Sequence, residues 1–119
     1  MNTLKIILRY LFAVLMILAG VNHFLKPTGY LPFVPDFLPQ MAIVYLSGIV
    51  EIAVGLAVFI PKYRHWGTLG ILILMLVFLP LHTLDFFSQN PAIGSHQAAV
   101  IRLPIQFVLI AWAWFIHKN

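Results

Sequence analysis

Four long runs of apolar residues, separated by short polar or proline-rich segments, dominate the chain. The runs cover residues 4–24, 41–60, 67–84 and 98–116. At about 1.5 Å per residue, each is about long enough to cross the roughly 30 Å hydrocarbon core of a bilayer. Outer-membrane strands alternate polar and apolar residues, whereas these runs are continuous and need helices to satisfy their backbone groups in lipid. The pattern predicts an all-α fold, an integral membrane four-helix bundle, with residues 1–119 as a single transmembrane domain.

The composition agrees with a protein that lies almost entirely in the bilayer. Of the 119 residues, 62% are hydrophobic and 8% are charged, whereas soluble domains carry about 25% charged residues. This balance excludes an ordinary soluble enzyme, a disordered tail and a coiled coil. The absence of cysteine excludes disulfides, thiolate metal sites and iron–sulfur clusters. Phosphate-binding loops, dinucleotide fingerprints and nucleic-acid motifs are also absent from the sequence, so we expect no nucleic-acid partner.

The positions of the cations predict how the chain is oriented. Five cations fall on the side of the two chain ends and the second connection, 61–66, and two fall on the other side: Lys5, Arg9, Lys62, Arg64 and Lys118 against Lys26 and Arg102. Because cytoplasmic segments are enriched in Lys and Arg, both termini are predicted to be cytoplasmic. The first run also resembles a secretory signal, whose cleavage would leave three spans, but its poor cleavage site at residues 18–20 favours four spans.

The two outer connections differ from the short basic turn at 61–66. Residues 25–40 hold four prolines among aromatic and aliphatic residues. Proline at this density prevents a regular helix, and the apolar residues favour the membrane interface over water. We interpret this segment as a stiff loop on the outer membrane face, a lid over the bundle. Residues 85–97 are more polar and contain turn signals at 90–91 and 94–95.

Polar side chains in or beside the apolar runs are the candidates for a functional site, because a charge in lipid is costly. Glu51 stands about 15 Å below the outer end of its helix, so it must face protein. Gly48 and Gly55 share its small-residue face, which lets another helix approach closely. All the candidates fall in the outer half of the bundle: Asn22, His23, Ser47, Glu51, His82, Asp85, Arg102 and Gln106.

Structural interpretations stay open beside the functional one. In the structural interpretation, Glu51 would pair with Arg102 or accept a hydrogen bond from His23. Arg102 would instead reach the lipid headgroups of the outer face. Asp85, three residues after His82, either orients that ring or caps the end of the helix. His23, His82 and Glu51 suit zinc or iron chemically. No His-x-x-x-His or Glu-x-x-His spacing supports such a site, so we expect no metal.

Nearly the whole chain also follows the order of motifs in a known family, most strongly in its first half. Residues 19–24 read Ala-Gly-Val-Asn-His-Phe and precede Pro27, and residues 45–51 contain Ser-Gly-x-x-Glu. This order resembles the DoxX-like family of small four-helix membrane proteins, and its motifs correspond to His23, Ser47, Gly48 and Glu51. The resemblance implies a protein of the bacterial cytoplasmic (inner) membrane, linked to quinone-coupled sulfur oxidation or to membrane redox complexes.

Three functions fit these residues. The first is an accessory subunit that binds a lipophilic, quinone-like ligand through apolar walls, hydrogen-bond donors and a carboxylate or His that passes protons. A quinone is the one cofactor that this first function suggests. The chain has no electron carrier of its own, so a membrane redox partner would have to supply one. We therefore expect no catalysis by the chain alone. The second is a structural or assembly scaffold without a ligand. The third is a small transporter or proton pathway, which requires a homo-oligomer because four spans are few. The lipid bilayer is a partner in all three.

Overall fold

In the computed structural model, residues 3–118 are described, and within this range the chain is all-helical. Four long helices are joined by short connections, the first of which holds two 3-10 turns: α1 (Thr3–Leu25), η1 (Pro27–Gly29), η2 (Leu31–Phe33), α2 (Gln40–Phe59), α3 (Arg64–Phe86) and α4 (His96–His117). Each long helix is long and apolar enough to cross a membrane. The all-α prediction is therefore confirmed, and the helices indicate a multi-pass membrane protein. Residues 1, 2 and 119 of the predicted domain, including the chain ends of the orientation prediction, lie outside the described residues.

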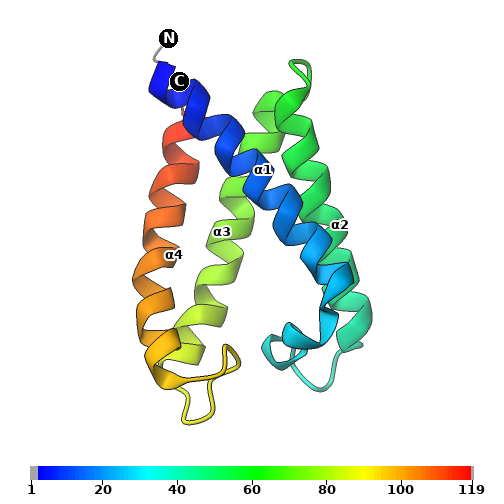
Figure 1. The fold of residues 1–119 in the computed structure, drawn as a ribbon, viewed down its shortest axis with the longest axis vertical. Helices are drawn as coiled ribbons and strands as arrows, with labels where there is room; N and C mark the ends of the chain where they lie inside the picture. The colour runs from blue at the N-terminus through cyan, green and yellow to red at the C-terminus, as the bar shows by residue number, and fades with distance from the viewer. Residues whose placement is uncertain (1–2, 119) are drawn as a thin grey trace.

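Neighbouring helices run in opposite directions and form an elongated bundle (Figure 1). The start of α1, the α2–α3 turn and the end of α4 lie at one end, which we call the basic end because it carries Lys5, Arg9, Lys62, Arg64 and Lys118. The connections at residues 26–39 and 87–95 lie at the opposite end, which we call the loop end. Helix α1 packs mainly on α2, α2 on α3, and α3 on α4, whereas α1 and α4 share far fewer contacts.

The helices leave most of their apolar surface facing outward. Between 17% and 28% of the residues in the spanning windows are buried, so the larger part of each helix lacks protein neighbours. Large side chains stand in this outer surface, among them Leu18, Ile49, Trp66, Leu84 and Val108, each more than half exposed. Exposing so wide an apolar surface to water would be unfavourable for a monomeric protein, whereas the hydrocarbon chains of a bilayer would cover it without this penalty.

The basic end is closed by a hydrophobic core and by hydrogen bonds between helices. Phe12 and Met16 of α1 pack there with buried residues of α3 and α4. The Trp112 indole N–H donates to the Leu8 carbonyl at 3.1 Å, and the Arg64 guanidinium donates to the Tyr10 hydroxyl at 2.8 Å. These contacts join α1 to α4 and to α3 at the basic end.

Two glycines bring α1 and α2 together in the half of the bundle near the loop end. A Cβ atom on Gly20 would lie 2.6 Å from the Gly48 carbonyl oxygen, and one on Gly48 would lie 2.9 Å from the Gly20 carbonyl oxygen and from His23 Cβ. A Cβ on Gly55 would similarly meet the Ala13 carbonyl oxygen at 2.8 Å. The small-residue face predicted on the second helix is therefore confirmed as the contact with α1.

The ends of the four long helices differ by one to three residues from the ends of the predicted spans. Helix α3 begins at Arg64, within the predicted turn 61–66, and it continues to Phe86, past the predicted start of the third connection. Helix α4 begins at His96, where the Ser95 hydroxyl accepts from the Ala98 N–H at 3.1 Å and caps the first turn. Polar and aromatic residues at the ends of spans extend the helices beyond the apolar runs, which is why hydropathy alone sets these ends too short.

Candidate functional site

A cavity of about 550 Å³ lies at the loop end, between the α1–α2 and α3–α4 pairs. Its volume falls within the range of roughly 300–1,000 Å³ that is usual for small-molecule sites. All four long helices and both outer connections contribute to its lining: Ala19, His23, Tyr30, Phe33, Val34, Pro35, Leu38, Ile43, Val44, Ser47, Glu51, Val77, Phe78, Leu81, His82, Ile93 and Arg102. Most of these residues are apolar, and a few polar groups converge among them.

The cavity gathers five of the eight candidates predicted from the sequence. His23, Ser47, Glu51, His82 and Arg102 line it. These residues come from four different helices, so their proximity depends on the packing of the whole bundle. The other three candidates, Asn22, Asp85 and Gln106, do not line this cavity and have partners of their own.

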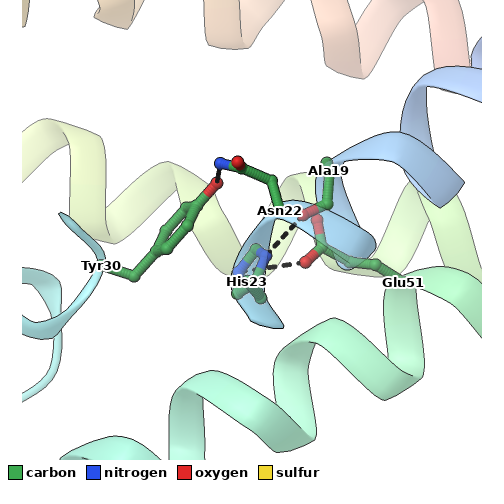
Figure 2. Close-up of polar contacts among 5 residues, drawn as sticks. All are labelled: Ala19, Asn22, His23, Tyr30 and Glu51. Atoms are coloured by element: carbon green, nitrogen blue, oxygen red, sulfur yellow. Dashed lines mark hydrogen bonds and ion pairs between the residues drawn. The ribbon is translucent and has the colours of Figure 1, made fainter. Parts of the chain in front are cut away.

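His23 and Glu51 form a buried pair across the α1–α2 contact (Figure 2). The two residues are 7% and 4% exposed, and His23 Nε2 lies 3.1 Å from Glu51 Oε2. The other ring nitrogen, Nδ1, lies 2.7 Å from the Ala19 carbonyl oxygen. Of the two partners predicted for Glu51, the structure therefore selects His23. Glu51 and Arg102 form no ion pair in the described part of the chain.

The geometry of this pair allows a proton to be held by either His23 or Glu51. A carbonyl oxygen can only accept, so the His23 Nδ1 atom carries a hydrogen and donates it to Ala19. The exchangeable proton then belongs to Nε2 or to the Glu51 carboxyl group. Glu51 Oε2 is out of line for a hydrogen bond with Nε2, and it has no hydrogen-bond partner within residues 3–118. This oxygen can therefore still bond to a ligand in the cavity.

An aromatic ring from the proline-rich segment covers His23. Tyr30 stacks on the imidazole with ring centroids 3.9 Å apart and an angle of 13° between the planes. Its hydroxyl accepts from the Asn22 side-chain amide at 2.6 Å (Figure 2). Asn22 therefore acts beside the cavity, as the residue that holds Tyr30 in place.

The rest of the proline-rich segment forms the wall of the cavity at the loop end. The Gln40 side chain donates to the Val34 carbonyl at 2.8 Å and to the Leu31 carbonyl at 3.2 Å, which ties the segment to the start of α2. Phe33 meets the His82 ring edge-on, with centroids 5.8 Å apart. The segment thus covers the bundle as a lid would. Tyr30 and Phe33 were not among the predicted site residues, although both were visible as aromatic residues between prolines.

His82 and Arg102 present unsatisfied polar atoms from the other helix pair. Both residues are half-buried, yet His82 Nδ1 and Arg102 Nη1 are fully buried and have no hydrogen-bond partner in the described chain. Leaving a buried polar group unpaired costs about 1–3 kcal/mol, and more when the group is charged. Because both residues line the cavity, a polar ligand there would remove part of this cost.

Asp85 and Gln106 have structural roles. The Asp85 carboxylate accepts from the backbone N–H groups of Ala92 at 2.5 Å and Ile93 at 3.1 Å. It therefore holds the third connection against the end of α3, a contact that differs from both roles predicted for it. Gln106 is fully buried and donates to the Met75 carbonyl at 2.6 Å, between α3 and α4. Within residues 3–118, the His, Asp and Glu side chains form no group of three that could hold a metal ion.

Replacing Asp85 with alanine should destabilise the loop end and leave the cavity in place. Two partly buried backbone N–H groups would lose their acceptor, at a cost of up to about 3 kcal/mol each. Thermal unfolding of the detergent-solubilised protein would measure this loss. Asp36→Ala is the matched control, because Asp36 is exposed and accepts only a long contact, 3.4 Å, from Gln40. Equal stability of the two variants would show that Asp85 does not hold the third connection in place.

Comparison with protein families finds a match over almost the whole chain. The family described as a domain of unknown function (DUF8561) matches residues 12–117. No curated protein and no solved structure matches the chain. The matched range includes every residue of the cavity lining. The family description assigns no activity, and the resemblance to the DoxX-like family stays a prediction.

Proposed function

Given that the chain belongs to the DUF8561 family, we propose that it binds a lipophilic, quinone-like ligand in the cavity at the loop end. The observation that carries this proposal is the cavity of about 550 Å³ with apolar walls and buried polar atoms that lack partners. A scaffold without a ligand would gain nothing from leaving Arg102 Nη1 and His82 Nδ1 unsatisfied, because unpaired buried polar groups cost stability. The polar atoms therefore favour the ligand hypothesis over the scaffold hypothesis.

The chemistry of the lining suits a ring with carbonyl groups and an apolar tail. Aromatic and aliphatic residues such as Phe33, Val44 and Phe78 would contact the ring and the tail. Arg102 would donate to a carbonyl oxygen, and the His23–Glu51 pair would hold a proton close to the head of the ligand. A quinone would bring the redox chemistry, while these side chains bind it, orient it and exchange its protons.

The cellular setting is part of the proposal. The five cations at the basic end would face the cytoplasm of a bacterium, with both termini on that side of the inner membrane. The cavity would then open in the outer half of the bilayer, where a membrane-dissolved ligand can enter between helices. His23, Ser47 and Glu51, which carry the DoxX-like motifs, all line the cavity, and this supports a role as an accessory subunit beside a membrane redox protein. The transporter hypothesis stays a prediction.

The test is retention of a ligand by the protein released from its membrane in mild detergent. Native mass spectrometry, with organic extraction of the same sample, should find a quinone-sized molecule bound to the chain. Glu51→Gln should weaken retention at least about 10-fold, since it removes an interaction worth about 1.4 kcal/mol or more. Asp36→Asn, a carboxylate change outside the cavity lining, should retain the ligand fully. A bare chain, or one bound only to another protein, would contradict the proposal and favour the scaffold.

A further inference from the structure

Arg102 is a half-buried cation that forms no ion pair with any residue in the range 3–118. It lies in the second turn of α4, lines the cavity, and has one guanidinium nitrogen that is fully buried without a hydrogen-bond partner in the described chain. A guanidinium is charged at every physiological pH and offers five N–H donors. Burying such a group next to apolar walls is costly unless an anion compensates it.

The chain holds only three acidic side chains, and each is engaged elsewhere. Glu51 pairs with His23 on the opposite side of the cavity. Asp85 accepts from the backbone of the third connection. Asp36 is exposed and interacts with Gln40 at the end of the proline-rich segment. None of the three forms an ion pair with Arg102 in the described part of the chain, so its counter-charge has to come from another molecule.

His82 reinforces this polarity. Its buried Nδ1 atom lacks a partner and lies in the lining of the same cavity, on the helix that packs against α4. The α3–α4 side therefore presents a cation and an imidazole, while the α1–α2 side presents the His23–Glu51 pair. A neutral head group would satisfy hydrogen bonds here but would leave the charge of Arg102 uncompensated.

We infer that the ligand of this cavity is an acidic amphiphile, an apolar body with one oxyanion on its head, and that Arg102 binds that oxyanion. The inference rests on the proposed function, since it concerns the same cavity and defines the class of molecule bound there. Carboxylates and acidic hydroxyl groups on quinone-type rings share this chemistry. Arginine binds such oxygens with strong, charge-assisted hydrogen bonds.

Matched acidic and neutral probes test this assignment. Equilibrium binding to the detergent-solubilised protein is measured for dodecanoic acid against dodecanol, and for a 2-hydroxy-3-alkyl-naphthoquinone against its 2-methoxy ether. The acidic member of each pair should bind about 10- to 100-fold more tightly than the neutral member. This ratio corresponds to the free energy of one hydrogen bond to a charged group. Comparing the two pairs shows whether the site takes the fatty-acid type of anion, the quinone type, or both.

Variants of Arg102 assign the preference to this residue. Arg102→Gln should abolish the preference for the acidic probes over the neutral ones, whereas Arg102→Lys should keep part of that preference. Arg9→Gln is the matched control, because Arg9 also has a buried nitrogen without a partner but lies on α1 near the basic end. Circular dichroism and gel filtration verify that each variant is folded. The Arg102→Lys result keeps the test decisive if Arg102→Gln unfolds.

The outcomes separate this inference from the proposed function. Equal binding of acidic and neutral probes by the unmodified protein would overturn the inference and leave the proposed function standing. An acidic preference that survives Arg102→Gln would overturn the role of Arg102, as expected if this side chain only contacts lipid headgroups. Failure of every probe to bind would overturn both.

Discussion

Replacing Gly48 with alanine is expected to lower the free energy of unfolding by about 1–3 kcal/mol, the cost of overpacking a tight contact. The added methyl group would lie 2.9 Å from the Gly20 carbonyl oxygen and from His23 Cβ, so α1 and α2 must move apart. That movement would separate His23 from Glu51, whose Nε2 and Oε2 atoms lie 3.1 Å apart in the unmodified protein. Chemical or thermal unfolding in detergent measures the stability, and native mass spectrometry measures the accompanying loss of ligand.

Two further glycine variants make this prediction specific. Gly29→Ala should leave stability unchanged, because a Cβ atom at Gly29 meets nothing within 4 Å. Gly20→Ala should be as harmful as Gly48→Ala, and the double variant should cost less than the sum of the two, since one separation of the helices relieves both contacts. Two results would show that this close approach does not hold α1 and α2 together. One is a double variant whose loss of stability equals the sum of the two single losses. The other is a Gly48→Ala protein as stable as the Gly29→Ala protein.

The helices were predictable because lipid leaves the backbone few choices. A span without water must satisfy its own N–H and C=O groups, so a continuous apolar run of sufficient length indicates a helix. The ends of the helices were less predictable, because they depend on individual caps. Ser95 starts α4 through its hydroxyl, and Asp85 accepts from two backbone N–H groups seven and eight residues later. Hydropathy carries no information about such contacts.

The members of the site were more predictable than their partners. Burying polar groups in an apolar bundle is costly, so His23, Glu51 and Arg102 stood out from sequence alone. The choice of His23 over Arg102 as the partner of Glu51 depends on where α1 crosses α2, and the glycine contact decides that crossing. Tyr30 was missed because it lies in a connection, and its stacking on His23 requires the chain to fold back over the bundle.

Filling the cavity from Ser47 is expected to reduce ligand binding more than about 100-fold, a loss of roughly 3 kcal/mol. Ser47 lines the cavity four residues before Glu51, so the two side chains share one face of α2. A tryptophan at this position would occupy space that the ligand needs and would cover the Glu51 carboxylate. Binding of the probes to Ser47→Trp, measured in the same detergent as for the unmodified protein, checks this expectation.

The neighbouring residue supplies the control that separates a cavity from the lipid surface. Leu46 is 57% exposed and points outward from the same turn of α2. Leu46→Trp should therefore bind the probes as the unmodified protein does, while Ser47→Trp shows the large loss of binding. If a ligand instead coats the apolar exterior, the two variants would behave alike, because each adds one indole to the same helix. Undiminished binding by Ser47→Trp would thus place the ligand outside the cavity, where Glu51 and Arg102 have no reason to act on it.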